Sequence, residues 1–270
     1  MGGELDWTGP SREVAVNDSH QGVVTCVLFD LYGTLLDVGL DEDQPALWQG
    51  LATALRACGG TVGAPDDVRR RFRQILGEEA ARAGEGFLLD ATFRRLLAGV
   101  GARGEVASLG RVFRQLSIRQ LSIRTYVAPM FAALRQTACH LGIVSNTEAV
   151  LTHFDLDRFP ILRSVDTLVL SSEVGVRKPD PRIFRIALDR LQVPAGTAVF
   201  VGNSLDEDVL GARRADLRAI HVDDSATGVD RVAGDPSVLR AAPTAEALRQ
   251  ALQMFGWQAS SPATQAGSGS

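Results

Sequence analysis

Four short polar clusters, each placed directly after an apolar run, contain the side chains of this sequence that could carry out chemistry. The first cluster, DLYGT, begins at Asp30 and closes the run VVTCVLFDL, residues 23–31. Because desolvating an unpaired charge is unfavourable by several kcal/mol, a carboxylate at this position must gain a partner or a ligand. Such a carboxylate, positioned beside a cation, can act as a nucleophile. Asp is also common in turns and helix caps, and this cluster alone does not separate the two roles.

The second and third clusters contain groups that suit an anion. Ser145 and Asn146 close the apolar run 141–146, and a hydroxyl with free backbone N–H groups at a strand-to-helix junction can bind an anionic oxygen. The same residue types are standard helix N-caps. Lys178 precedes Pro179 and Pro181, which restrict the backbone and hold the lysine in a loop. A lone surface lysine would be solvated instead.

The fourth cluster, VGNSLDEDVLGA at residues 201–212, could bind a divalent cation. Asn203 and Asp208 follow an apolar run and offer the hard oxygen ligands that such cations prefer. An acidic loop that caps a helix is the competing interpretation. Asp206 and Glu207 could include a catalytic acid, but we interpret them as solvated charges at a helix N-terminus, where the helix dipole stabilises them.

The elements that must position these clusters are alternating strands and helices. Strands are expected at 23–31, 140–146, 166–172, 197–203 and 218–224, and helices at 128–137, 147–156, 178–191 and 206–216. The first run is apolar without alternation, which is typical of a strand covered on both faces. We therefore predict an α/β fold with a doubly wound parallel sheet, in which functional side chains gather at the carboxyl ends of the strands.

A different pattern separates the first strand from the rest of the sheet. Helical periodicity is found at 46–59, 64–84, 88–101 and 108–124, which predicts an all-α insertion of four helices. The predicted domains are an α/β core at 23–37 and 125–255 and a helical cap at 38–124. Residues 1–22 are polar and unperiodic, and the last ten residues, SPATQAGSGS, are small, so we expect a disordered N-terminus at 1–22 and a flexible tail at 256–270.

The composition limits the partners. The chain has 270 residues, a net charge of -4 and a pI near 5.6, so it lacks the basic field that holds nucleic acid by its phosphates. A small anionic substrate would need locally placed cations. No apolar run is long enough to span a bilayer, and no signal peptide is recognisable. We expect a cytoplasmic protein that binds neither nucleic acid nor membrane; oligomeric state is not readable from the sequence.

Taken together and in this order, the clusters resemble the four motifs of the haloacid dehalogenase superfamily. The matching segments are FDLYGTLLD, IVSN, SSEVGVRKPDPRIF and FVGNSLDEDVLGA. The resemblance covers about 23–37 and 125–224, and the helical insertion lies where the superfamily has its first type of α-helical cap. It implies that Asp30 is the nucleophile of a covalent aspartyl intermediate and that Lys178 neutralises charge. The groups implied to hold the transferred group are Thr34, Ser145 and Asn146.

The resemblance also implies a bound Mg²⁺, and here the sequence departs from the phosphatase pattern. The implied ligands are Asp30, the backbone carbonyl of Tyr32, Asn203 and Asp208. Asn203 replaces the usual Asp, so we expect weakened metal binding. Tyr32 stands where phosphatases carry their acid–base Asp, and a phenol with a pKa of about 10 is poorly matched to proton exchange near neutrality.

Two activities fit this mixture of motifs. Tyr in the frame DxYGTL is similar to the 2-haloacid dehalogenases, which need no metal. The frame VGNSxxxD is closer to the phosphatases, and Phe184 stands where the dehalogenases have a Tyr. We favour a Mg²⁺-dependent phosphatase acting on a small phosphorylated metabolite, either a phosphate ester or an acyl phosphate. The alternatives are a metal-independent 2-haloacid dehalogenase and a catalytically weak binding or regulatory protein.

Overall fold

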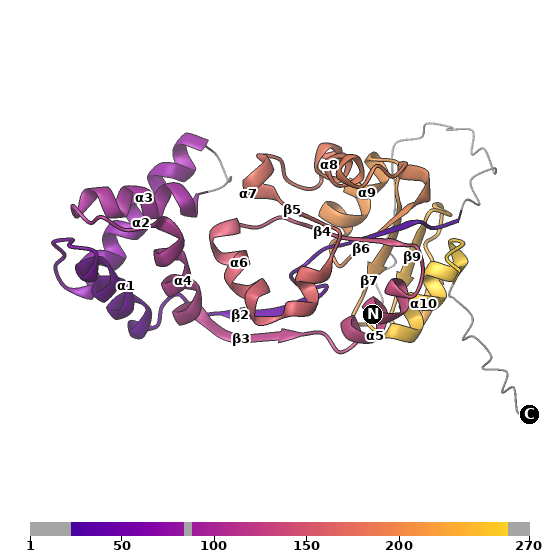
Figure 1. Cartoon of the computed structure of the whole chain (residues 1–270), viewed down its shortest axis with the longest axis horizontal. Coiled ribbons are helices and arrows are strands. Elements are labelled where there is room, and N and C mark those ends of the chain that lie inside the picture. Colours follow the sequence, from indigo (N-terminus) through magenta and orange to yellow (C-terminus); the bar gives the residue numbers. More distant parts are fainter. Residues whose placement is uncertain (1–22, 84–87, 259–270) are drawn as a thin grey trace, which may run out of the picture.

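A seven-stranded sheet forms the centre of the protein, and a two-stranded ribbon connects it to four helices (Figure 1). The computed structural model describes residues 23–83 and 88–258. The expected disordered N-terminus, 1–22, lies outside these residues. The strand order in the sheet is β5-β4-β1-β6-β7-β9-β8, and all neighbours are parallel except β8 and β9. The predicted doubly wound α/β fold is confirmed.

The strands of the main sheet are short and mostly buried. Their bounds are β1 Cys26–Phe29, β4 His140–Ser145, β5 Thr167–Leu170, β6 Ala198–Gly202, β7 Arg218–Val222, β8 Val229–Arg231 and β9 Val238–Ala241. The helices of this part are α5 Val127–Arg135, α6 Ala149–Arg158, α7 Ser171–Val174, α8 Pro181–Leu191, α9 Gly211–Arg214 and α10 Ala245–Met254, with short 3₁₀ turns at Pro160–Ser164 and Ala195–Thr197 and a π-turn, η3, at Leu205–Leu210.

Helices cover both faces of the sheet, which explains the uninterrupted apolar run of β1. Val27 and Phe29 pack in a core with residues of α5 and α10, whereas Cys26 and Leu28 pack on the other face with residues of α8 and α9. All four side chains of β1 are fully buried. Since successive side chains of a strand point to opposite faces, only a strand with a core on each side needs apolar residues at every position.

The four helices between β2 and β3 form a unit of their own, which we call the four-helix unit. They are α1 Pro45–Ala57, α2 Pro65–Ala83, α3 Leu89–Gly99 and α4 Val106–Ser117. Their apolar faces enclose a separate core that includes Trp48, Phe72, Phe93 and Phe113, whose rings contact one another. Among the described helices, none is long and apolar enough to cross a membrane.

The predicted fourth helix is wrong beyond Ser117. Residues Ile118–Ile123 are strand β3, which pairs antiparallel with β2, Leu36–Leu40, and the two strands connect the core to the four-helix unit. The sequence QLSIRQLSIR has enough apolar residues for a helix face, but a partner strand about eighty positions away satisfies its backbone instead. Strand propensity depends strongly on such tertiary partners, so the local pattern could not decide.

The carboxyl end of the chain also differs from the prediction. Strands β8 and β9 and helix α10 complete the sheet edge and its cover, and none of them was predicted individually. Trp257 is buried in the core, so the expected flexible tail does not begin at residue 256. The rest of that tail, 259–270, lies outside the described residues.

Helix α4 of the four-helix unit packs closely on helix α6 of the α/β core. Gly110 faces Val150, and a Cβ atom on Gly110 would lie 2.4 Å from Val150 Cγ2 and 2.8 Å from the Val150 carbonyl oxygen. Val150 and Leu151 pack against the core of the four-helix unit. The two parts of the chain therefore share apolar surface, and a glycine sets how near their helices come.

Replacing this glycine tests the packing. We expect Gly110→Ala to lower the free energy of unfolding by about 1–3 kcal/mol, because the added methyl group meets backbone atoms that cannot move aside. Gly77 is a matched control, since it lies in exposed helix α2 with nothing within 4 Å of its Cβ position. Gly77→Ala should stabilise the protein by about 0.5–1 kcal/mol. Urea denaturation measures both, and equal effects would contradict the close packing of α4 on α6.

Candidate active site

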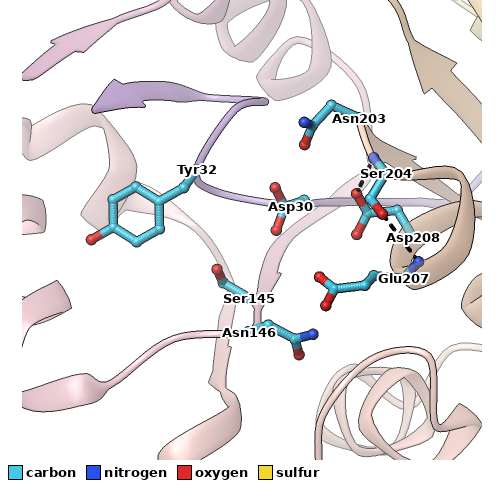
Figure 2. Close-up of a pocket in the computed structure, with 8 residues that line it drawn as sticks. All are labelled: Asp30, Tyr32, Ser145, Asn146, Asn203, Ser204, Glu207 and Asp208. Atoms are coloured by element: carbon cyan, nitrogen blue, oxygen red, sulfur yellow. Dashed lines mark hydrogen bonds between the residues drawn. The ribbon is translucent and has the colours of Figure 1, made fainter. Parts of the chain in front are cut away.

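The four clusters meet around one cavity at the carboxyl edge of the sheet. Asp30 follows β1, Ser145 ends β4, and Asn203 and Asp208 follow β6, three adjacent strands of the sheet. The cavity has a volume of about 180 Å³. Its lining residues, all shown in Figure 2, are Asp30, Tyr32, Ser145, Asn146, Asn203, Ser204, Glu207 and Asp208. Parallel strands place their ends together, which is why the order of the clusters in the sequence predicted this meeting point.

Lys178 links two carboxylates beneath the cavity. Its Nζ donates to Asp30 Oδ1 at 2.6 Å and to Asp208 Oδ1 at 2.6 Å. All three residues are buried, with 3%, 6% and 1% of their surfaces exposed for Lys178, Asp30 and Asp208. Such a cluster of three charges carries one net negative charge. Burial of this kind is tolerated only when each charge has a partner, and here the ammonium serves both carboxylates.

The pKa values of this cluster reflect the competition between burial and pairing. Burial raises the pKa of Asp30 to about 6, although the Lys178 charge acts in the opposite direction. Burial by itself would lower the pKa of Lys178, but the charges of Asp30 and Asp208 outweigh it and raise that pKa overall. The lysine is therefore a permanent cation, whereas Asp30 gains its negative charge at the cost of desolvation.

Asn146 contacts the main chain of Lys178. Its Oδ1 accepts from the Lys178 backbone N–H at 2.7 Å, and its Nδ2 donates to the Lys178 carbonyl oxygen at 2.9 Å. Both ends of the amide are thus used to hold the lysine main chain, which fixes the direction of the lysine side chain. Ser145 is buried in the cavity wall with 2% of its surface exposed. That these two residues bind substrate stays a prediction.

Thr34 is not among the residues that line the cavity. It is fully buried, and its hydroxyl donates to Asn203 Oδ1 at 3.2 Å. Gly33, the residue before Thr34, has φ of +82°, and a Cβ atom there would lie 2.7 Å from Asn203 Nδ2. Only glycine combines this backbone conformation with such a close approach. The predicted catalytic Thr34 therefore orients Asn203 in this structure.

The oxygen atoms near Asp30 determine whether a divalent cation could bind. In the described parts of the chain, no group of three or more His, Cys, Asp or Glu residues is arranged to hold a metal. Asp208 Oδ2 accepts from the Ser204 backbone N–H at 2.9 Å, which fixes that carboxylate. The cavity lining offers three carboxylates, Asp30, Glu207 and Asp208, and the amide oxygen of Asn203, of which Asp30, Asp208 and Asn203 are the predicted ligands. An all-oxygen set with one or two carboxylates fits Mg²⁺, which keeps several waters.

The Tyr32 side chain points away from Asp30, as Figure 2 shows. Its hydroxyl donates to Asp155 Oδ2 at 2.6 Å, on helix α6. Burial raises the pKa of Tyr32 above its ordinary value. A phenol that is committed to this contact cannot exchange protons with a group bound at Asp30. Tyr32 stands at the acid–base position of the sequence pattern, but its hydroxyl contacts Asp155 on helix α6 instead of the cavity.

Glu207 lines the cavity, as does Ser204, and neither was predicted as a site residue. The Glu207 carboxylate is directed toward the space beside Asp30 and Asn146 (Figure 2), and its backbone N–H donates to Ser204 Oγ at 3.2 Å. Glu207 is partly exposed and lies in the first turn of the π-turn at Leu205–Leu210, as the interpretation of a charge at a helix N-terminus expects, and it also lines the cavity. Asp206 is exposed.

The fold and the cavity together define an α/β protein with an acidic site at the carboxyl edge of a parallel sheet. A family model described as "haloacid dehalogenase-like hydrolase" matches residues 24–216. The chain belongs to this family and is a hydrolase.

Relatives that resemble this chain in sequence are named as phosphatases. The chain is 29% identical over 203 residues to a glyceraldehyde 3-phosphate phosphatase of Methanopyrus kandleri, covering 74% of this chain and 84% of the relative. It is 30% identical over 196 residues to a phosphoglycolate phosphatase of Xanthomonas campestris, covering 72% of this chain and 80% of the relative.

Solved structures include both activities. The chain resembles a HAD phosphatase from Thermococcus onnurineus with a TM-score of 0.55 and 26% identity, covering 84% of this chain and 97% of that one. A 2-haloacid dehalogenase from Pseudomonas syringae gives a TM-score of 0.58 at 23% identity, covering 86% of this chain and 100% of that one. At this identity the second likeness shows the fold alone.

The raised pKa of Asp30 predicts a pH-dependent stability. Its folded value of about 6 lies above the ordinary 3.8, so between these values the folded protein keeps a proton that the unfolded chain has lost. Ionisation of Asp30 therefore lowers stability as pH rises through this window. In metal-free protein, Asp30→Asn should raise the free energy of unfolding by about 1–3 kcal/mol at pH near 7.5, and the gain should vanish near pH 4.

Denaturation in urea with a chelator measures this effect at both pH values. The matched control is Asp206→Asn, which removes an exposed carboxylate from the turn after β6. We expect no pH-dependent difference for the control. An Asp30→Asn variant that is destabilised equally at both pH values would contradict the prediction.

Proposed function

We propose that this chain is a Mg²⁺-dependent phosphatase that uses Asp30 as a nucleophile on a small phosphorylated metabolite. The observation that carries the proposal is the contact of Lys178 with both Asp30 and Asp208 at the cavity floor, 2.6 Å in each case. A carboxylate is a weak nucleophile that needs fixed geometry and a nearby cation, and both are present. Relatives named as phosphatases of small metabolites support the same reaction class.

The charge of the cavity supports a metal requirement. Three lining residues carry carboxylates, Asp30, Glu207 and Asp208, and no described lining residue is cationic. Lys178 lies behind two of them and is already shared. A phosphate dianion would meet this negative charge unless a further cation accompanies it. Mg²⁺ held by Asp30, Asp208, Asn203 and the Tyr32 carbonyl would supply that charge and polarise the phosphoryl oxygens.

The residues of the chain then perform a two-step transfer. An oxygen of Asp30 attacks phosphorus, the bond from phosphorus to the leaving oxygen breaks, and that oxygen departs with the bonding electrons. Water next attacks the phosphoaspartate, which releases phosphate and restores the Asp30 carboxylate. Lys178 offsets the charge of the nucleophile throughout. Because Tyr32 is committed to Asp155, substrates with good leaving groups, including acyl phosphates, should react faster.

Dehalogenation of a 2-haloacid is the second candidate and is less well supported. The substrate of that reaction carries a carboxylate and no accompanying metal is needed. Without a metal, the carboxylates that line this cavity would repel such a substrate, since like charges brought together cost several kcal/mol. A catalytically weak binding protein is the third candidate and is supported by no contact in the cavity.

An assay with an activated ester tests the proposed activity. We expect hydrolysis of 4-nitrophenyl phosphate that requires Mg²⁺, stops when chelator is added, and falls at least about 10³-fold in Asp30→Asn. Phosphate release and nitrophenol release measure it. Turnover that persists in chelator would exclude the metal-dependent mechanism. Halide release from 2-chloropropionate without metal would favour the dehalogenase instead.

The carboxylate of Glu207 in the cavity lining leads us to expect a preference among phosphate esters. A carboxylate beside the leaving group should favour neutral, hydroxylated leaving groups over carboxylated ones. We expect Glu207→Gln to raise kcat/KM for 2-phosphoglycolate relative to glycerol 1-phosphate by about 10-fold, equal to about 1.4 kcal/mol. Asp206→Asn, on the same turn but exposed, should leave the ratio unchanged. An unchanged ratio in Glu207→Gln would show that Glu207 does not select the substrate.

A further inference from the structure

A second buried charge cluster lies beside the proposed active site and takes no part in its chemistry. Arg114 on helix α4 donates through Nε to Asp155 Oδ2 at 2.8 Å, and a second guanidinium nitrogen donates to the same oxygen. The Tyr32 hydroxyl donates to this oxygen as well, at 2.6 Å. Three donors from two other segments therefore converge on one carboxylate oxygen of helix α6.

The two charged side chains of this cluster are buried. The Arg114 and Asp155 side chains are 5% and 0% exposed. The guanidinium carbon of Arg114 also lies 5.3 Å from the centre of the Tyr32 ring, within the range of a cation–π contact. Among the described residues, Asp155 Oδ1 has no hydrogen-bond partner. The carboxylate thus depends on Arg114 and Tyr32 for its stabilisation, and without Arg114 its charge would be buried with no cation beside it.

Tyr32 connects this cluster to the catalytic loop, residues 30–36. The backbone of that loop is fixed at Asp30, whose N–H donates to the Val201 carbonyl, and at Thr34, whose carbonyl accepts from the Tyr126 hydroxyl. Between these two points, the Tyr32 side chain extends toward α6 and α4. The position of this side chain constrains the backbone of Tyr32, including the carbonyl that the proposed function assigns to the metal, and the peptide that follows Leu31.

We propose that Arg114 and Asp155 are positioning residues for the catalytic loop and act through Tyr32. Where an acid–base carboxylate would stand, this chain has a tyrosine that joins the loop to the four-helix unit. Asp30 and the Tyr32 carbonyl then keep their positions relative to each other only while α4 remains packed on α6. The proposal rests on the proposed function for its kinetic consequences, but the anchoring of the loop does not depend on any activity.

The most direct test removes only the phenolic oxygen. Tyr32→Phe keeps the ring and the Arg114–Asp155 pair but loses the contact with Asp155. We expect kcat for 4-nitrophenyl phosphate to fall roughly 10- to 100-fold with KM changed less than about 3-fold, because a misplaced nucleophile affects the chemical step. The Mg²⁺ concentration for half-maximal activity should rise as well. Hydrogen–deuterium exchange of residues 30–36 should be faster than in the wild type.

A second variant tests the contribution of the four-helix unit. Arg114→Met alone would leave Asp155 buried without a cation and could unfold the protein, so it is combined with Asp155→Leu, which replaces the pair by apolar side chains of similar volume. We expect this double variant to show the same kinetic and exchange changes as Tyr32→Phe. Adding Tyr32→Phe to it should change little further, because all three residues act as one unit.

Arg111→Met is the matched control. Arg111 lies one turn before Arg114 on the same helix, and its guanidinium carbon lies 5.8 Å from the ring of Phe154 on α6, so it joins the same two helices without contacting Tyr32. This variant should keep wild-type kinetics and exchange. Tyr32→Phe kinetics within 2-fold of the wild type, together with unchanged exchange at residues 30–36, would overturn the proposal. If the reductions in kcat caused by Tyr32→Phe and by the double variant multiply when the three substitutions are combined, the proposal would also be overturned.

The two proposals can fail separately. A wild-type protein without Asp30-dependent phosphate release would refute the phosphatase, and faster exchange at residues 30–36 in Tyr32→Phe would still support the anchoring. Conversely, a normal phosphatase activity that Tyr32→Phe leaves intact, with unchanged exchange, would refute only the anchoring.

Discussion

The contact of one ammonium group with two buried carboxylates constrains the rest of this structure. Lys178 reaches Asp30 and Asp208 at 2.6 Å, and the three charges leave one negative charge in a nearly dry site. Such a cluster is stable only if each member is fixed, and the surrounding contacts do this. Asn146 holds the main chain of the lysine, and the Ser204 N–H holds the second oxygen of Asp208. The uncompensated charge is also what a divalent cation would neutralise.

A second buried ion pair, Arg114 with Asp155, stabilises the fold and takes no part in the proposed chemistry. Arg114 and Asp155 are balanced charges, so they can remain buried without a ligand, and they connect the four-helix unit to helix α6. Val150 and Leu151 extend the same contact by packing into the core of the four-helix unit. The unit is therefore attached to the α/β core by helix packing as well as by the ribbon of β2 and β3. Tyr32 lies where these two systems of contacts meet.

The sheet by itself does not distinguish the activities of this family, since a phosphatase and a dehalogenase have similar folds. The distinction lies in the charges that line the cavity. Glu207 adds a carboxylate to those of Asp30 and Asp208 in the cavity lining, and like charges repel an anion. That carboxylate lies in the π-turn at Leu205–Leu210.

The sequence by itself determined the class of fold and the location of the site. Strands that are apolar at every position, each followed by polar residues, require a parallel sheet with its functional groups on one edge, and this held for Asp30, Ser145 and Asp208. Only the tertiary structure decided the tasks of individual side chains. Tyr32 and Asn146 use their polar atoms on Asp155 and Lys178, partners more than thirty positions away. Local sequence specifies a backbone, whereas hydrogen-bond partners and burial depend on which segments the fold brings together.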